Sequence, residues 1–394
     1  MSLSIALAGK PNCGKSTLFK AATLANVEIA NYPFTTIDAN HGIAYVRTDC
    51  PCKKMESRCG NCTNGERFVP IELIDVAGLV PDAHLGKGLG NTFLDHLRQA
   101  NAIIHVIDAS GGTDIEGNPV DIGSHDPVLD VAFLEHEITM WIVGILKRNW
   151  EKLSRKIKSE GLKMEKVLAE QLEGAGVSET HIRMALITTK IDQSTITKWT
   201  EEEIIGLVDE MRKMSKPLII AANKFDIAPK ENIEKLLALN YTVIPTSAAA
   251  EIALKMAAKG GIIDYLPGDR DFNITGDVTK QQSVALGKMK ELLTNSEYSG
   301  TGVQECINEA VFVLLNQIVA YPVEDEGKFS DKKGRVLPDA YLLKKGSTAK
   351  DLAYMVHSDI GDGFLYGIDA HQKMRIGEKH ELATGDVVKI VSTK

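Results

Sequence analysis

The sequence lacks any run of 18 uncharged apolar residues, so it offers no candidate for a membrane-spanning helix. No positively charged leader precedes the first apolar segment, and we therefore expect neither a membrane anchor nor a signal peptide. Cysteine is scarce, with six residues in 394, which excludes a disulfide scaffold and indicates the reducing cytoplasm. An excess of basic residues is also absent, because 45 basic and 53 acidic side chains give a net charge of −8. No global basic field indicates nucleic-acid binding, although a local basic region remains open.

The chain is long enough for two or three domains with a sizeable core. Its 44% apolar and 25% charged residues are ordinary for a water-soluble globular protein. Short apolar runs that read as buried strands alternate with helical patterns, and this alternation predicts an α/β fold.

The segment from Gly9 to Thr17 matches G-x-x-x-x-G-K-[ST], the phosphate loop of nucleoside-triphosphate enzymes. An apolar run at 3–8 predicts a strand before it, and residues 17–22 predict the opening of a helix after it. A glycine-rich turn without a ligand is the alternative, and it does not account for strand, loop and helix together. We predict that the β- and γ-phosphates are neutralised by Lys15 and that Mg²⁺ is held by Ser16. The predicted nucleotide-binding residues here are Gly9, Lys10, Pro11, Asn12, Cys13, Gly14, Lys15, Ser16 and Thr17.

Two later segments have residues that suit a γ-phosphate sensor. Thr36 lies in a loop from which a threonine can reach the metal, although loop threonines more often cap or turn. Asp75 ends a predicted strand at 69–74 and suits Mg²⁺ binding through a water molecule. Gly78 suits a backbone N–H directed at the γ-phosphate, and the glycine-rich stretch 78–90 predicts a second switch.

Two further strand ends hold candidate base contacts, after apolar runs at 217–222 and 241–245. These contacts are Asn223, Lys224, Asp226, Ser247 and Ala248. A buried carboxylate at Asp226 can accept hydrogen bonds from the ring N–H and the amino group of guanine. Adenine would leave that carboxylate unpaired, at a cost of about a few kcal/mol. The alternative is a plain strand-end turn, which Asn and Asp also favour.

In this chain order the segments resemble the motif set of the small GTPases. The stretches 31–38, 75–80 and 83–90 narrow the resemblance to the Obg-like GTPases, specifically the YchF subfamily in its archaeal form. It covers essentially the whole chain. The resemblance implies that Ser16 and Thr36 ligate Mg²⁺ and that Asp75 binds it through water. It also implies that Asn223, Lys224, Asp226 and the Ala248 backbone hold the base.

The remaining architecture follows the same resemblance. Strand signals vanish from 127 to 214, where apolar residues recur at helical spacing, and this insertion is similar to the coiled-coil arm of the subfamily. Helices are expected to continue to about 319. Residues 334–388 resemble a TGS domain, a ubiquitin-like β-grasp module shared with threonyl-tRNA synthetases. We therefore expect a P-loop GTPase domain at 1–320 and a TGS domain at 321–394.

The predicted activity is hydrolysis of GTP to GDP and phosphate with Mg²⁺. Several YchF relatives have a degenerate base motif and prefer ATP, whereas the intact motif from Asn223 to Asp226 predicts GTP. Leu79 stands where Ras-like enzymes place a glutamine, and leucine cannot orient water, so hydrolysis should be slow. His84 is a candidate substitute or an exposed loop histidine without a task. The predicted catalytic residues are Lys15, Thr36, Gly78 and His84.

Further residues bear on an additional cofactor and on the partner. In some related GTPases an asparagine at the position of Asn12 helps to bind K⁺ beside the phosphates. Residues 147–166 hold eight basic and three acidic side chains, a local charge of +5, which fits a solvated helix face or an RNA-contacting arm. With the resemblance, this suggests a cytoplasmic monomer that acts as a switch on the ribosome or another RNA assembly. The alternative is an adaptor or RNA-binding module that holds GTP and barely turns it over.

Four of the six cysteines lie between the loop that contains Thr36 and the strand that ends at Asp75, as C-x-C followed by C-x-x-C. They are Cys50, Cys52, Cys59 and Cys62. Four thiolates within 13 residues suit a tetrahedral zinc site, although the first pair is unusually tight for a zinc knuckle. A redox-sensitive disulfide pair and free thiols are the alternatives. We expect Cys13 and Cys306 to be unconnected to this group.

Overall fold

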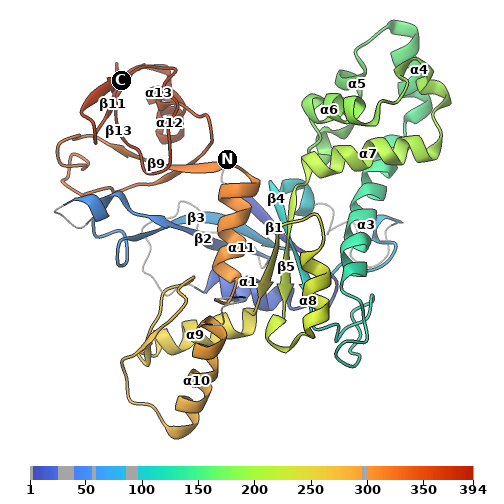
Figure 1. The fold of residues 1–394 in the computed structure, drawn as a ribbon. Helices are drawn as coiled ribbons and strands as arrows, with labels where there is room; N and C mark the ends of the chain where they lie inside the picture. The colour runs from blue at the N-terminus through green and yellow to red at the C-terminus, as the bar shows by residue number, and fades with distance from the viewer. Residues whose placement is uncertain are drawn as a thin grey trace.

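The computed structural model of the chain describes residues 3–24, 40–55, 59–85, 96–294, 298 and 300–393. Figure 1 shows a central sheet with a helical arm on one side and a C-terminal domain on the other, both projecting in the same direction. None of the helices within these residues is long and apolar enough to cross a membrane.

The central sheet has six strands in the order β2-β3-β1-β4-β5-β6. The strands are β1 (Ser4–Ala8), β2 (His41–Asp49), β3 (Glu66–Asp75), β4 (Ala102–Asp108), β5 (Leu218–Asn223) and β6 (Val243–Thr246). All neighbours pair in parallel except β2 and β3, which are antiparallel. Parallel pairing places the carboxyl ends of these strands at one edge, where an open α/β sheet binds its ligands. The expected α/β sheet is confirmed.

The helical arm is made of α3 (Val128–Lys147), α4 (Trp150–Glu160), α5 (Met164–Leu172), α6 (Glu179–Thr189) and α7 (Glu201–Ser215). In α3, Leu134, Ile138 and Ile142 recur every four residues and are fully buried, which is the apolar stripe that a packed helix requires. Helix α7 begins with a capping box, in which Thr200 and Glu203 bond each other's backbone N–H groups. The all-helical arm expected from the sequence is present.

The rest of the central domain consists of α1 (Lys15–Thr23), α8 (Lys230–Leu237), α9 (Ala248–Lys259), β7 (Ile263–Asp264), β8 (Asn273–Ile274), α10 (Lys280–Thr294) and α11 (Val303–Asn308). The expectation of helices as far as 319 is wrong in two places. A small hairpin, β7 and β8, interrupts them, and a strand begins at Gln317. Strands of two residues are too short to leave a sequence pattern.

The C-terminal domain is a five-stranded sheet in the order β10-β9-β13-β11-β12. Its elements are β9 (Gln317–Val323), β10 (Tyr341–Lys344), α12 (Ala349–Val356), α13 (Ser358–Asp362), β11 (Phe364–Asp369), β12 (Met374–Ile376) and β13 (Val387–Ser392). The central pair, β9 and β13, is parallel, and the other pairs are antiparallel. This is the expected β-grasp arrangement, and its first strand begins shortly before the expected boundary at 321.

The two domains share a hydrophobic core. One continuous cluster of buried residues runs from Ile5 and Leu73 of the central sheet to Tyr321 and Leu337 of the C-terminal part. In Figure 1 the end of β2 and the start of β3 lie beneath the C-terminal domain. The contact is therefore an apolar interface between packed domains.

Candidate nucleotide site and cysteine cluster

The phosphate loop joins β1 to α1 at the carboxyl edge of the sheet. Gly9 has φ 158° and Gly14 has φ 94°, backbone conformations that side chains rarely adopt. A Cβ at Gly9 would lie 2.4 Å from the carbonyl oxygen of Val106, and one at Gly14 would lie 2.2 Å from Nδ2 of Asn223. The packing of the loop therefore requires both glycines, in addition to the room that a phosphate needs.

Two side chains of the loop point into the interior. The Nζ of Lys10 donates to the carbonyl oxygen of Thr113 at 2.8 Å and pairs with Asp130 Oδ2 at 2.9 Å. Cys13 is fully buried, and this burial raises the pKa of its thiol to about 11. Because both side chains are occupied in supporting the loop, these residues can offer a nucleotide only their backbone N–H groups.

The other loop residues line the start of α1. Lys15 begins this helix and is 8% exposed, at the end where helix N–H groups favour anions. The Nδ2 of Asn12 donates to the carbonyl oxygen of Gly117 at 3.0 Å, and a Cβ at Gly117 would lie 2.5 Å from the carbonyl oxygen of Pro11. The loop at 113–118 therefore packs directly against the phosphate loop. The exposed side chains are those of Asn12, Ser16 and Thr17.

Asn223 connects the phosphate loop to the loop after β6. Its Nδ2 donates to the carbonyl oxygen of Cys13 at 3.0 Å, and its Oδ1 accepts from the N–H of Ala248 at 3.2 Å. Ser247 caps α9, because its hydroxyl oxygen accepts from the N–H of Ala250. One buried amide thus brings the predicted phosphate and base segments together.

Lys224 makes a second connection to the phosphate loop. Its Nζ donates to the carbonyl oxygen of Asn12 at 3.0 Å and to Asp108 Oδ2 at 2.8 Å. Asp108 is fully buried at the end of β4 and also accepts from the hydroxyl groups of Ser110 and Thr113. Burial alone would raise the pKa of Asp108, but Lys224 and Ser110 outweigh it and lower that pKa. No role for Asp108 was predicted from the sequence, although its place at a strand end was an available signal.

Asp226 lies in a short turn at Phe225–Ile227, and its side chain is exposed. The expectation of a buried carboxylate is therefore wrong for this structure. The carboxylate remains available beside Lys224, so a base placed there would itself exclude the water.

The predicted magnesium residues Ser16 and Asp75 meet at the start of α1. The Ser16 hydroxyl donates to Asp75 Oδ2 at 3.0 Å. The other carboxylate oxygen, Oδ1, is buried and has no hydrogen-bond partner within the described part of the chain. A buried oxygen without a partner needs an explanation, and Mg²⁺, which takes oxygen ligands, fits this pair. Thr36, the third predicted contributor, lies outside the described residues.

Leu79 points away from the phosphate loop. It is 1% exposed and belongs to the hydrophobic core, while its N–H donates to the carbonyl oxygen of Gly9 at 3.1 Å. A Cβ at Gly78 would lie 3.1 Å from the ring of Pro11, so the backbone passes close to the phosphate loop. The chain thus presents backbone to the loop at 78 and no side chain at 79.

His84 lies in a short turn at Ala83–Leu85, where Glu137 of α3 holds it. Its Nδ1 lies 2.7 Å from Glu137 Oε2, and the backbone N–H groups of Asp82 and His84 donate to the same carboxylate at 2.9 Å. The His84 side chain is 12% exposed, so it is not the exposed loop histidine of the alternative interpretation. The tautomer with Nδ1–H donating to Glu137 leaves Nε2 as an acceptor. Glu137 left no signal in the sequence, because a pair so distant along the chain has no local pattern.

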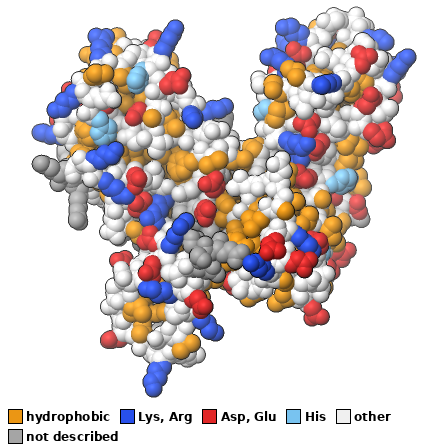
Figure 2. Space-filling view, in the orientation of Figure 1, with side chains coloured by type: hydrophobic (Ala, Val, Ile, Leu, Met, Phe, Trp, Pro, Cys, Tyr) orange, Lys and Arg blue, Asp and Glu red, His pale blue; other side chains and the backbone are white. Residues whose placement is uncertain are grey.

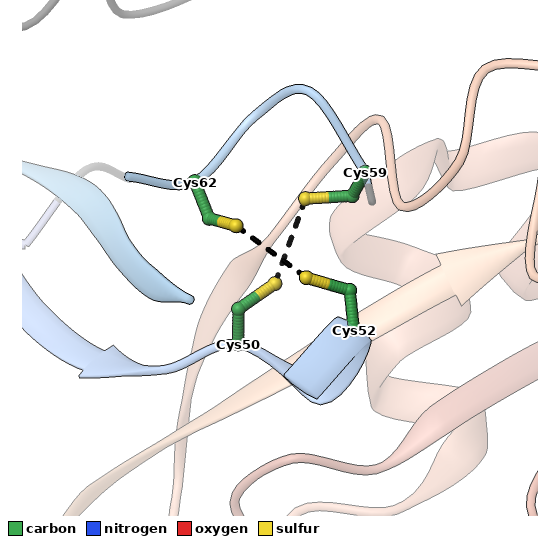
Figure 3. A group of neighbouring side chains, drawn as sticks. All are labelled: Cys50, Cys52, Cys59 and Cys62. Atoms are coloured by element: carbon green, nitrogen blue, oxygen red, sulfur yellow. Dashed lines mark hydrogen bonds between the residues drawn. The ribbon is translucent and has the colours of Figure 1, made fainter. Parts of the chain in front are cut away.

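The four predicted cysteines converge in the loop between the end of β2 and the start of β3 (Figure 3). Their sulfur atoms all lie within 4.8 Å of one another, so the group could hold a metal ion. The hydrogen bond between Cys50 and Cys59 lowers the pKa of Cys59, because it stabilises a thiolate there. Cys13 and Cys306 are buried elsewhere, as expected.

Comparisons with known proteins match three segments of the chain to family models and up to 99% of it to single relatives. Residues 4–143 match the family described as 50S ribosome-binding GTPase, residues 221–325 match the G4 motif-containing domain of the YGR210-like Obg-like GTPases, and residues 329–392 match the TGS domain. An uncharacterised GTP-binding protein of Methanocaldococcus jannaschii is 53% identical over 98% of each chain. The ribosome-binding ATPase YchF of Bacillus subtilis is 29% identical over 93% of this chain and 87% of its own. The crystal structure of a GTP-binding protein from Pyrococcus horikoshii OT3 is 42% identical, covers 99% of this chain and 100% of its own, and has a TM-score of 0.77.

Proposed function

This chain belongs to the Obg-like GTPases of the YchF subfamily in its archaeal form, and from that membership we propose that it hydrolyses GTP to GDP and phosphate with Mg²⁺ as a slow, ribosome-associated switch. The observation that carries this proposal is the buried amide of Asn223. It bonds both the phosphate loop, at Cys13, and the Ala248 backbone. One hydrogen-bonded set of residues would therefore contact both a triphosphate on the loop and a base at the Asn223–Asp226 motif.

The base preference is proposed to be guanine. The intact motif supports this preference, as does the description of the Methanocaldococcus jannaschii relative as a GTP-binding protein. The relative from Bacillus subtilis is described as an ATPase, so preference differs within the family. An adenine against Asp226 would leave the carboxylate without a donor pair, which disfavours ATP.

Affinity measurements on the full chain test the base preference. GTP should bind about 100-fold or more tightly than ATP, and Asp226→Asn should abolish most of that difference. Asp277→Asn, an exposed carboxylate before α10, is the matched control and should leave both affinities unchanged. Tighter binding of ATP than of GTP by the unaltered chain would overturn the proposal.

We propose that the Ser16 hydroxyl and the Asp75 carboxylate would hold Mg²⁺ beside the phosphates, with Thr36 as the further ligand that the family resemblance implies. The support is the buried Oδ1 of Asp75, which has no partner among the described residues. When bound, the ion would neutralise charge that develops on the phosphate oxygens. The protein contributes the Ser16 hydroxyl and the fixed Asp75 carboxylate, while Lys15 adds a positive charge.

Hydrolysis is proposed to be slow because no side chain at position 79 reaches the attacking water. Leu79 is in the core, and Glu137 holds His84, the candidate substitute. The same observation favours a second candidate function, an adaptor that retains GTP and barely turns it over. Single-turnover hydrolysis with and without ribosomes separates the two, because a switch should accelerate on the ribosome and an adaptor should not.

K⁺ is a further proposed cofactor. Asn12 lies on the exposed rim of the loop, and its Nδ2 is fixed by Gly117, which leaves Oδ1 as the end of the amide that can face a cation. Turnover measured in K⁺ should exceed turnover in Na⁺ at equal ionic strength. Equal rates in the two salts would discard this cofactor.

The ribosome is proposed as partner on the basis of two observations. One is the description of the Bacillus subtilis relative as ribosome-binding. The other is that all eight basic side chains between 147 and 166 are exposed. Figure 2 shows Lys and Arg side chains dispersed among acidic ones on the visible face of the arm, so the positive charge there is spread out.

A further inference from the structure

The four cysteine sulfurs are close enough to one another to share one tetrahedral metal ion. The Cys50 and Cys59 sulfurs are 3.7 Å apart, those of Cys52 and Cys62 are 3.4 Å apart, and no pair exceeds 4.8 Å. Zinc–sulfur bonds of about 2.3 Å place two ligands of a tetrahedral ion about 3.8 Å apart. A disulfide pair needs only two sulfurs to approach, whereas here all four point to one centre (Figure 3).

The loop that holds the cysteines is closed by its own hydrogen bonds. Asn64 and Gly65 have φ values of 52° and 80°, the pair of left-handed residues that a tight hairpin turn requires. The N–H of Cys50 donates to the carbonyl oxygen of Gly65 at 2.8 Å, and the N–H of Asn61 donates to the Cys59 sulfur at 3.4 Å. The ligands are therefore held near one another by the backbone before any ion binds.

A buried cation lies beside the cluster. Arg67 is 6% exposed and donates to the carbonyl oxygens of Asn61, Leu337 and Pro338. Within the described residues, no carboxylate lies at ion-pair distance from its guanidinium. A buried charge of this kind calls for a counter-charge nearby, and Zn²⁺ with four thiolates has a net charge of −2.

A buried hydroxyl also lies near the sulfurs. Tyr321 of β9 is fully buried, and its hydroxyl has no hydrogen-bond partner in the part of the chain that the structure describes. Burial raises the pKa of Tyr321, and charges at Cys50 and Arg67 act on the same hydroxyl, so these groups lie within electrostatic range of it. None of the four sulfurs makes a hydrogen bond to this O–H, so the hydroxyl is a neighbour of the cluster and not a partner of it.

We propose that Cys50, Cys52, Cys59 and Cys62 bind one structural Zn²⁺, and that this zinc knuckle fastens the C-terminal domain to the central sheet. The connection is direct, because the Nδ2 of Asn61, between two ligands, donates to the carbonyl oxygens of Val336 and Leu337.

The segment that receives these bonds is strained. Leu337 has φ 43°, a conformation that a bulky residue keeps only where its surroundings enforce it, and its side chain is fully buried in the shared core. Asn61 and Arg67 both donate to its carbonyl oxygen. Opening of the knuckle removes both donors from position, so the segment 329–338 should relax when the metal is lost.

This role is independent of the nucleotide. The knuckle joins β3 at Glu66, whereas the proposed magnesium residue Asp75 is at the other end of the same strand. Loss of zinc should therefore loosen the C-terminal domain while GTP still binds.

Metal content is the first test. The full chain, purified without added metal, should contain about one zinc per molecule, as should the control Cys306→Ser, whereas Cys59→Ser and Cys62→Ser should contain less than about a tenth of that. A stoichiometry near zero in the unaltered chain would overturn the proposal, whether mass spectrometry then finds free thiols or a disulfide in the cluster.

Hydrogen exchange on the full chain tests the fastening, and it needs no cysteine variant that could misfold. Asn61→Ala keeps all four ligands and should keep the zinc. The amides of 329–338 should exchange about tenfold faster in this variant and in chelator-treated protein, while those of β1 stay unchanged. Lys54→Ala, an exposed change in the same loop, is the matched control. A zinc-containing Asn61→Ala chain with unaltered exchange would refute the fastening.

Discussion

The contact between His84 and Glu137 bears on how the predicted second switch, residues 78–90, could take part in the proposed hydrolysis. The carboxylate fixes the ring through Nδ1, and with Nδ1–H as the donor Nε2 remains an acceptor. We therefore infer that Glu137 would act as a positioning residue for His84. If the water is oriented by His84, the ring and its carboxylate should affect turnover and not the affinity for GTP.

We expect His84→Ala to lower the single-turnover rate by about 100-fold with little change in the GTP dissociation constant. Glu137→Gln should lower it by about tenfold, because a side-chain amide only partly replaces the carboxylate acceptor. His84→Gln should retain more activity than His84→Ala, since an amide can orient water. The control is His136→Ala, an exposed histidine whose ring is 6.0 Å from that of His84. Equal rates for His84→Ala and the unaltered chain would show that His84 only attaches its turn to Glu137 and does not act in hydrolysis.

A second histidine should make stability depend on pH. His105 lies in β4, and burial, with a smaller effect of Lys10, lowers its pKa from 6.5 to about 3. Between these pH values His105 is protonated in the unfolded chain and neutral in the folded chain. Stability therefore falls as pH falls from 6.5, by about 1.4 kcal/mol per pH unit for one such group.

Urea unfolding midpoints at several pH values between 7.5 and 4.5 check this expectation. Unaltered protein should lose stability more steeply below pH 6.5 than His105→Leu, whereas the exposed His136→Leu should follow the unaltered protein. Parallel curves for His105→Leu and the unaltered chain would contradict the buried neutral histidine.

At the scale of elements, the local patterns of the sequence predicted most of what lies at the sheet edge. Mostly apolar runs marked β1, β4 and β5, because strands buried on both faces have few polar positions. The pairings between elements could not be predicted in this way. Asp108 with Lys224 and Glu137 with His84 each join distant segments, so only the folded chain shows them. Asp226 follows β5 as the motif requires, but the sequence did not show that the turn around it leaves the carboxylate exposed.

The capping box of α7 gives an element-scale prediction. Thr200→Ala removes the acceptor for the N–H of Glu203 and should destabilise the arm by about 0.5–2 kcal/mol. Trp141, Trp150 and Trp199 are the three tryptophans of the chain and all lie in the arm, so their fluorescence reports its unfolding. Thr197→Ala, an exposed threonine three residues earlier, should leave the urea midpoint unchanged. An equal shift of the urea midpoint in both variants would show that loss of the cap is not the cause.

At the scale of the whole molecule, α3 is the element through which the nucleotide site can reach the arm. Asp130 in its first turn pairs with Lys10 of the phosphate loop, and Glu137 two turns later holds the second switch. The same helix is the first of the arm and ends at Lys147, where α4 follows. A change in either loop on GTP binding or hydrolysis would therefore act on the base of the arm.

The arm in turn has a charge pattern that can be tested against an RNA surface. Lys147 pairs with Glu201 and Arg155 with Glu151, but Lys152, Lys156 and Lys163 have no carboxylate within ion-pair distance among the described residues. Unpaired exposed lysines are free to replace counterions on phosphates, so binding through them should weaken with salt.

Substitution of Lys152, Lys156 and Lys163 by Glu should lower the affinity for ribosomes by at least about tenfold. It should also make the affinity depend less on salt. The slope of log affinity against log salt concentration should become shallower by about 0.7–0.9 for each phosphate that the variant no longer neutralises. Reversal of Lys259, Lys280 and Lys288, which are exposed on α9 and α10, changes the net charge equally and is the control. Sedimentation with ribosomes over a salt series measures both. If the two triple variants weaken binding alike, net charge alone accounts for the effect, and if neither does, the basic stretch is a solvated helix face. Only a loss confined to the arm variant makes α4 and the start of α5 the RNA-contacting surface, because the control holds everything but position constant.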